Sequence, residues 1–136
     1  MEPKIWGPPA WNFLHTVTLN YPENPTNEDK KNYYVFFNTL KYILPCPNCR
    51  SHYSENITKK PIQLESRDEL IQWLIDIHNE VNKLTGKREY SYNEVHKKFD
   101  KMYQGKNTNS INIILIIFLA LLIGYYYYIN YYQNTE

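Results

Sequence analysis

The only two cysteines of the chain, Cys46 and Cys49, are separated by two residues in the segment PCPNC. A disulfide at this spacing closes a very small loop and removes little entropy from the unfolded chain, so such a pair is more often reactive than structural. If a helix begins at Cys46, the orphan N–H groups and the dipole of its first turn stabilise the Cys46 thiolate. Cys49 then lies one turn further in and is more enclosed. The spacing therefore predicts an outer thiol that exchanges with a substrate and an inner thiol that faces another group.

Two other uses of this pair stay open on the sequence alone. Cys46, Cys49 and His52 could supply three zinc ligands to a membrane-tethered zinc-binding or adaptor module, although a structural zinc site usually has four. A thioredoxin-like redox site would need a strand before the motif, whereas residues 33–44 have the periodicity of a helix. A dithiol relay that passes disulfides on without using O₂ is a further alternative.

The residues around the motif are expected to form helices, because apolar side chains recur at helical spacing between turn residues. The expected starts are Pro8, Thr26 or Asn27, Cys46 or Pro47, Ser66 with Glu69, and Ser91 with Glu94; the expected ends are before Pro22, before Pro45, at Gly86 and at Gly105. No alternating strand pattern occurs. The predicted fold is all-α, a four-helix bundle with an additional short helix, plus a C-terminal transmembrane helix.

The transmembrane helix is predicted because residues 111–129 carry no charge and consist mostly of Ile, Leu, Phe and Tyr. As a helix this segment would be about 28 Å long, close to the roughly 30 Å hydrocarbon core of a bilayer. Residues 107–110 would be a polar joint, residues 130–136 a short tail, and residues 1–106 the functional domain. Lysines precede the span and none follows it, so the domain is expected on the cytosolic side. Thiols there are normally kept reduced.

Composition narrows the function classes. The hydrophobic content of 43% fits a globular domain, and the net charge of +1 without a basic stripe gives no case for nucleic-acid binding. Glu2 and Lys4 stand where a secretory signal would begin, and no such signal is recognisable.

Two polar and aromatic patches suggest a ligand. Two asparagines lie beside a histidine in the segment HNEVNK, residues 78–83, inside a strong helical pattern that asparagine disfavours. Lys83 and Lys87 add cations suited to phosphate. Trp11 and His15 share a helical face and would suit a flat heterocycle. The alternatives are a solvated polar helix face for the first patch and core packing for the second.

Four segments in order, WGPPAW with LH, YPENPT, LPCPNC followed by Arg50, and HNEVNKLTGK, closely resemble the Erv/ALR family of FAD-dependent sulfhydryl oxidases. The resemblance covers residues 6–103 and points to a minimal viral-type member. It implies a helical bundle that holds FAD without a GxGxxG turn. The cofactor-binding residues that it implies are Gly7, Trp11, His15, Tyr21, His78, Asn79, Val81, Asn82, Lys83, Lys87 and Phe99.

The resemblance also implies an activity. Cys46 would accept electrons from protein dithiols, Cys49 would pass them to FAD, and O₂ would receive them as H₂O₂. Many relatives carry a shuttle cysteine pair and a structural disulfide that are absent here, so either a separate dithiol protein acts as shuttle or substrates reach Cys46 directly. Phe99 stands where many relatives have Trp. A homodimer is expected, with the chain in the host cytoplasm or virion membrane of a large DNA virus and no metal bound.

Overall fold

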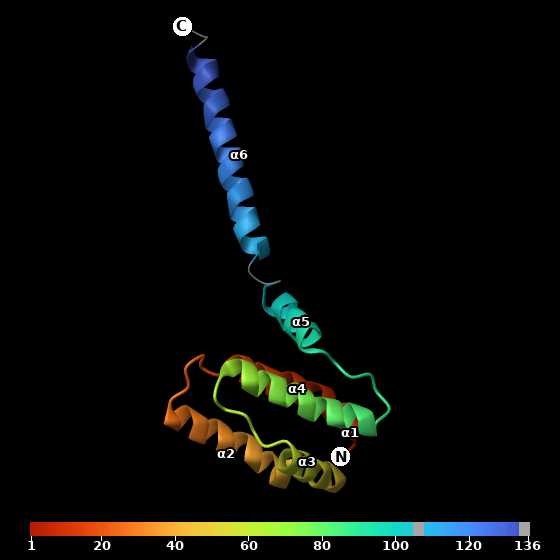
Figure 1. Ribbon diagram of the computed structural model, residues 1–136. Coiled ribbons are helices and arrows are strands. Elements are labelled where there is room, and N and C mark those ends of the chain that lie inside the picture. Colours follow the sequence, from red (N-terminus) through yellow and green to blue (C-terminus); the bar gives the residue numbers. More distant parts are fainter. Residues whose placement is uncertain (105–107, 134–136) are drawn as a thin grey trace. The chain divides into compact units, whose positions relative to one another are not determined.

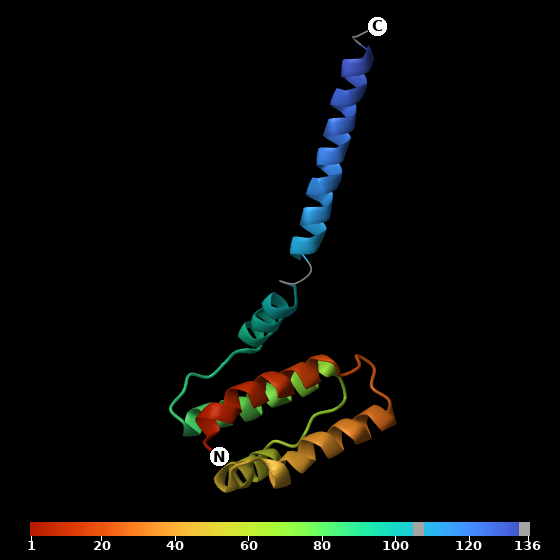
Figure 2. The same cartoon turned by 180° about the vertical axis from the view of Figure 1, so that it is seen from behind.

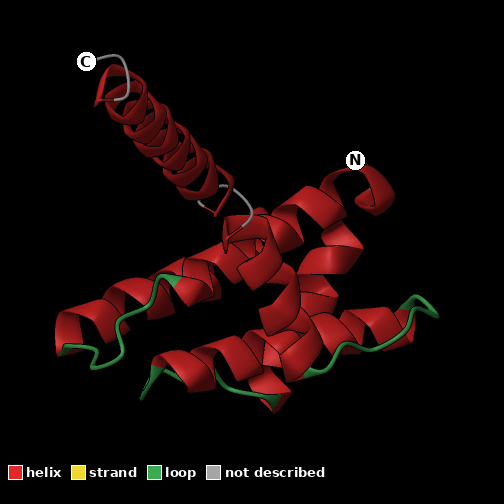
Figure 3. Cartoon of the chain, turned by 90° about the horizontal axis from the view of Figure 1, so that it is seen from above, coloured by secondary structure: helices red, strands yellow, loops and turns green. Residues whose placement is uncertain are grey.

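The computed structural model describes residues 1–104 and 108–133, and these residues form six helices (Figure 1). The helices are α1 (Pro3–Leu19), α2 (Asn27–Ile43), α3 (Pro47–Lys59), α4 (Arg67–Leu84), α5 (Tyr92–Gln104) and α6 (Thr108–Gln133). Within the described residues only helices and loops occur (Figure 3), which confirms the all-α prediction. The chain divides into two compact units, Met1–Val95 and His96–Glu136, and each is described by itself.

The first unit is built from two helix pairs. Helix α1 packs along α4, and the two opposite views of the chain show these helices side by side (Figures 1 and 2). Helix α2 contacts α3. Helix α3 also contacts α4 and so joins the pairs. This arrangement brings the start of α3, which carries the cysteines, into the same unit as the aromatic face of α1 and the polar segment of α4.

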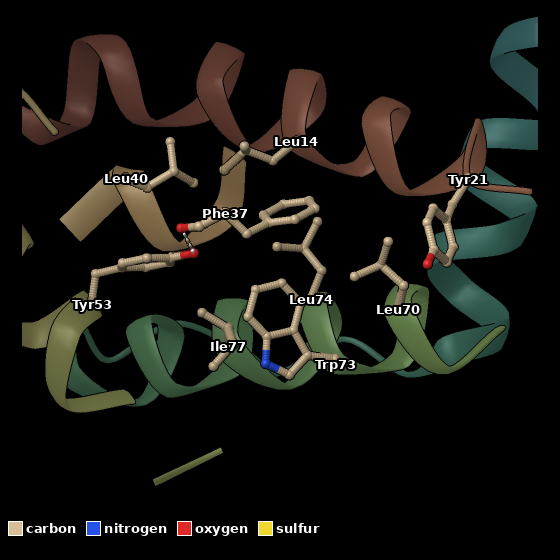
Figure 4. Packing of buried hydrophobic residues seen from close by; sticks show 9 residues of the cluster. All are labelled: Leu14, Tyr21, Phe37, Leu40, Tyr53, Leu70, Trp73, Leu74 and Ile77. Carbon is tan, nitrogen blue, oxygen red and sulfur yellow. Dashed lines mark hydrogen bonds between the residues drawn. The ribbon is translucent and has the colours of Figure 1, made fainter. Parts of the chain in front are cut away.

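The core of this unit lies between the two helix pairs (Figure 4). Phe37 from α2 and Leu70, Leu74 and Ile77 from α4 are fully buried. The Tyr53 hydroxyl of α3 donates a hydrogen bond to the Phe37 carbonyl oxygen at 2.9 Å, so this phenol can be buried without an orphan donor.

The indole N–H of Trp73, a second buried donor, holds the residue that follows α3 against α4. The Trp73 indole N–H donates to the Lys60 carbonyl oxygen at 2.9 Å, and the Trp73 ring lies edge-on to Phe37 with centroids 5.1 Å apart. The hydrogen bond and the ring contact hold the chain where it turns from α3 towards α4.

Side-chain caps start most of the helices where the sequence predicts. Thr26 and Asp29 form a reciprocal capping box before α2, and the Ser66 hydroxyl accepts the Glu69 N–H at 3.2 Å before α4. Ser91 and Glu94 form a second reciprocal box before α5. Hydrogen bonds from Ser91 and Arg88 lower the pKa of Glu94 to about 2.

The predicted start of the first helix at Pro8 is wrong, because α1 begins five residues earlier in the sequence, at Pro3. Pro3 occupies the first turn, where a missing N–H costs nothing. Pro8 and Pro9 lie inside the helix and cannot donate to the carbonyls of Lys4 and Ile5. Both of those residues are exposed, so water can satisfy their carbonyl groups.

Helix α4 ends at Gly86 as predicted, through a Schellman motif. Gly86 has a φ of 65°, a left-handed conformation that glycine adopts without the Cβ penalty of other residues. The Gly86 N–H donates to the Lys83 carbonyl at 3.3 Å and the Lys87 N–H donates to the Asn82 carbonyl at 2.8 Å. The motif therefore fixes the backbone at Lys87 directly beside the last turn of α4.

The second unit contains most of α5 and all of α6. Helix α6 includes the whole predicted anchor and residues 108–110 of the predicted joint, while residues 105–107 and 134–136 lie outside the described residues. The side chains of residues 115–128 are exposed. Within residues 1–104 and 108–133, no helix combines the length and hydropathy that a membrane span requires.

Candidate active site

The two cysteines lie at the beginning of α3, as the sequence predicts. Cys46 is the N-cap residue with an extended backbone, and Pro47 takes the first helical position. The Cys46 sulfur accepts the backbone N–H of Cys49 at 3.2 Å, in the place that Ser or Thr oxygen takes in ordinary helix caps. Both thiols are free in this structure and both are partly exposed.

The pKa values of the two thiols shift in opposite directions. Hydrogen bonds from the side chain and backbone of Cys49 lower the pKa of Cys46. Burial is the main reason that the pKa of Cys49 rises to about 11, with the neighbouring Cys46 sulfur adding to the effect. Because the thiolate is the reactive form, Cys46 is the better nucleophile of the reduced pair and the better leaving group from a mixed disulfide.

This difference predicts the order of alkylation. In the reduced protein at about pH 8, iodoacetamide is expected to modify Cys46 before Cys49, because the thiol with the lowered pKa is more ionised than the thiol with the raised pKa. Fragment mass spectrometry of the peptide that contains both residues, at successive times, measures the order. Modification of Cys49 should become fast only as the pH approaches its raised pKa. Equal rates at both positions at pH 8 would contradict the assignment of outer and inner thiol.

Arg50 holds the loop before the thiol pair, a role that sequence reasoning missed. Its guanidinium Nη1 donates to the Leu44 carbonyl oxygen at 2.6 Å, and its backbone N–H donates to the Cys46 carbonyl oxygen at 3.0 Å. A charged donor makes the first bond stronger than a neutral one. The one available signal was the position of Arg50 directly after Cys49.

Three of the residues predicted to bind the cofactor meet between α1 and α4. The rings of Trp11 and His78 are stacked, with centroids 3.9 Å apart and an interplanar angle of 6°. His15 Nε2 and His78 Nδ1 are 3.1 Å apart, within hydrogen-bond distance. His15 is buried, whereas Trp11 and His78 are half-buried, so the cluster has an accessible side. An aromatic wall of this kind can hold a planar heterocycle.

Asn79 instead clamps the chain that follows α4. Its amide nitrogen donates to the Tyr90 carbonyl oxygen and its amide oxygen accepts the Tyr90 N–H, each at 2.8 Å. The Tyr90 ring lies 5.7 Å from that of His78, so the clamp brings a further aromatic side chain to the cluster. The nitrogen and the oxygen of the Asn79 side-chain amide are both engaged in this way. The predicted contact of Asn79 with a cofactor stays a prediction.

Asn82 carries an orphan donor. The residue is 3% exposed, and its Nδ2 has no hydrogen-bond partner among the described residues. Leaving such a group without a partner costs about 1–3 kcal/mol, so a buried orphan donor is unusual in a folded protein. A ligand rich in acceptor oxygens, such as a dinucleotide, would satisfy it. On this observation the residues fit FAD.

The two predicted phosphate-binding lysines differ. Lys83 Nζ lies 3.4 Å from the Glu80 carboxylate and 3.5 Å from that of Glu89, and Glu80 is the main reason that the pKa of Lys83 is raised. Lys87 is exposed and follows the Schellman motif. An anion that binds Lys83 therefore has to compete with two carboxylates.

The remaining predicted cofactor-binding residues are dispersed. Gly7 lies in α1 with no atom within 4 Å of where a Cβ would stand, and Val81 is half-buried in α4. Tyr21 is fully buried, and its hydroxyl donates to the Leu64 carbonyl at 2.9 Å. Phe99 is buried and belongs to the second unit. Their contacts with a cofactor stay predictions.

The alternative zinc site has no counterpart in the part of the chain that the structure describes. There, no three His, Cys, Asp or Glu side chains are grouped closely enough to hold a metal ion, and His52 points to solvent on α3.

Comparison with known proteins gives one consistent result. The sequence profile of the Erv1 / Alr family matches residues 8–102. The probable FAD-linked sulfhydryl oxidase R368 of Acanthamoeba polyphaga mimivirus is 45% identical over 119 residues, which cover 85% of this chain and 83% of the relative. The FAD-linked sulfhydryl oxidase ERV1 of Arabidopsis thaliana is 35% identical over 71% of this chain, which spans only 50% of that relative.

A solved structure agrees. The FAD binding domain of Erv1 from Saccharomyces cerevisiae superimposes with a TM-score of 0.69 at 34% sequence identity, over 72% of this chain and 93% of that one. At this identity the likeness extends beyond the general shape of a helical bundle.

Proposed function

Because the chain belongs to the Erv1 / Alr family, we propose that it is an FAD-linked sulfhydryl oxidase that forms disulfide bonds in protein substrates. The observation that carries this proposal is the cysteine pair at the start of α3, whose outer thiol has a lowered pKa and whose inner thiol has a raised one. A pair with this asymmetry accepts a substrate thiol at one end and delivers electrons from the other.

The chemistry at the pair is thiol–disulfide exchange. A substrate thiolate attacks the Cys46 sulfur of the Cys46–Cys49 disulfide, a new S–S bond to the substrate forms, and Cys49 leaves as thiolate. The second substrate thiolate then attacks the substrate sulfur of this mixed disulfide, and Cys46 leaves as thiolate. The substrate has lost two electrons and the cysteine pair has gained them. Its lowered pKa makes Cys46 the better leaving group in the second step.

The cofactor is FAD, which accepts two electrons from the dithiol and passes them to O₂, giving H₂O₂. In this proposal Trp11, His15 and His78 hold the flat ring systems, and Asn82 supplies a buried donor. Lys83 and Lys87 provide positive charge for the phosphates. Gly7, Tyr21, Asn79, Val81 and Phe99 complete the proposed set.

The visible absorption spectrum of the purified full-length chain, followed by oxygen uptake on adding a dithiol, tests the proposal. A flavin spectrum with dithiol-dependent oxygen loss and peroxide formation is the expected result. A colourless, folded protein that contains zinc would overturn the proposal in favour of the metal site. Thiol exchange without peroxide would instead indicate a flavin-free relay.

We also propose, from the sequence of residues 111–129, that this segment anchors the domain of residues 1–106 to a membrane as a single pass with that domain in the cytosol, although no helix of the described residues meets the length and hydropathy of a membrane span. The support is the absence of charge from residues 111–129 and the exposure of the described side chains of residues 115–128. Retention of the full-length chain in the membrane pellet after carbonate extraction, with release of a chain that ends at residue 106, is the expected result. Release of both chains would oppose the anchor.

The proposed partners are protein dithiols, a separate shuttle protein and a second copy of the chain. The support for a homodimer is the number of exposed apolar side chains on α1 and α2: Ile5, Phe13, Tyr34, Val35, Tyr42 and Ile43. Sedimentation equilibrium of the holoenzyme gives the mass, and a monomer at micromolar concentration would contradict the dimer. The similarity to the mimivirus protein supports a viral origin, and a virion location is part of the proposal.

A further inference from the structure

We infer that Asn56, on the inward face of α3, donates a hydrogen bond from its amide nitrogen to the bound flavin cofactor. This inference rests on the proposed function, since it requires that the chain binds FAD. It assigns a cofactor contact to a residue that neither the sequence motifs nor the resemblance single out.

The first observation is an orphan donor in a buried position. Asn56 is 8% exposed, and its Nδ2 has no hydrogen-bond partner in the part of the chain that the structure describes. Nearly all buried polar groups in folded proteins are satisfied, so each exception needs an explanation such as a water or a ligand. Asn82 on α4 also has a buried side-chain nitrogen without a hydrogen-bond partner, and Asn82 is one of the residues proposed to bind the cofactor.

The second observation is the helix face on which Asn56 lies. Cys49, Tyr53 and Asn56 stand at positions i, i+4 and i+7 of α3, so they share one face. Tyr53 points from this face into the core beside Leu40 and Ile77 (Figure 4). Asn56 follows Cys49 by two turns, about 10 Å along the helix axis, which is comparable to the length of an isoalloxazine ring system. The inference requires that a cofactor next to Cys49 extends along the same helix face as far as Asn56.

The acceptors on the neighbouring turns are already engaged. The Phe37 carbonyl accepts the Tyr53 hydroxyl, and the Lys60 carbonyl accepts the Trp73 indole N–H. The carbonyl of Asn56 itself accepts the N–H of Lys60. A flavin supplies what is missing, since its ring carbonyls, its ring nitrogens N1 and N5 and its ribityl hydroxyls can each accept a hydrogen bond.

The test is the substitution Asn56→Leu in the full-length chain, which keeps the volume and removes the donor. Two quantities are measured: the thermal midpoint of the FAD-free protein and the dissociation constant of FAD from a fluorescence titration. We expect the midpoint to rise by a few degrees, because no orphan is left, and the dissociation constant to rise about tenfold, which is about 1.4 kcal/mol. An affinity within about twofold of the wild type would overturn the inference, because water then satisfies the amide.

Tyr53→Phe is the matched control on the same helix face. It removes a hydrogen bond that the protein satisfies by itself, so the thermal midpoint should fall while the FAD affinity stays within about twofold. Asn56→Ala gives a second reading of the affinity should the leucine variant not fold. Failure of the wild-type chain to bind FAD would refute the proposed function, whereas unchanged binding by the leucine variant refutes only the role of Asn56.

Discussion

Substitution of Cys49 by serine is expected to lower dithiol-dependent oxygen uptake by at least about a thousandfold while the protein keeps its bound FAD. A serine oxygen cannot form the disulfide with Cys46, so no oxidised pair exists for a substrate thiolate to attack. The cofactor contacts proposed on α1 and α4 remain intact. An oxygen electrode measures turnover, and the visible spectrum of the same sample measures bound flavin.

Ser51→Ala is the control for this experiment. Ser51 is exposed two residues further along α3, where its hydroxyl donates to Glu55, and its loss should leave turnover unchanged. Retained oxygen uptake in the Cys49→Ser protein would show that electrons leave the substrate by another route. Loss of the yellow colour would instead show that Cys49 is needed to bind the cofactor.

Substitution of His78 by alanine has the second largest expected effect, a loss of FAD affinity of about 10- to 100-fold. The His78 ring stacks on Trp11 and lies within hydrogen-bond distance of His15, so one substitution removes an aromatic surface and a polar contact. Each is worth about 0.5–1.5 kcal/mol, and 1.4 kcal/mol corresponds to a factor of ten. Fluorescence titration of the FAD-free protein gives the dissociation constant.

His52→Ala separates this effect from a general loss of histidine. His52 is exposed on α3, and its removal should change neither the FAD affinity nor the thermal midpoint. The same variant also tests the zinc alternative, which needs His52 as its third ligand. An unchanged affinity in the His78→Ala protein would remove the α1–α4 cluster from the cofactor site.

The helix starts were predictable because their causes are local in sequence. Thr26, Ser66 and Ser91 each accept a hydrogen bond from a backbone N–H three residues later, and this spacing can be read directly from the chain. The start of α1 was not predictable in the same way. Two adjacent prolines normally mark a first turn, but here α1 begins before both of them and continues through them.

The sequence indicated which residues belong to the candidate site better than it indicated the contacts that these residues make. Helical spacing placed Trp11 and His15 on one face of the first helix, and the resemblance added His78 to the cofactor-binding set. The packing of α1 against α4, which no local pattern indicates, brings His78 beside them. The amide of Asn79 binds the backbone of Tyr90, eleven residues away across a loop whose course no pattern indicates. The ion pair of Lys83 with Glu89 and the orphan amide of Asn56 likewise depend on tertiary packing.

The sulfur cap of α3 links catalysis to the folding of a single turn. When Cys46 is joined to a substrate, its sulfur becomes a neutral, poorer acceptor, and the Cys49 N–H loses much of its capping bond. When the substrate departs, the returning negative charge on Cys46 restores that bond at full strength. The covalent complex therefore has a weaker helix cap than the reduced pair, so the cap favours release of the product from Cys46.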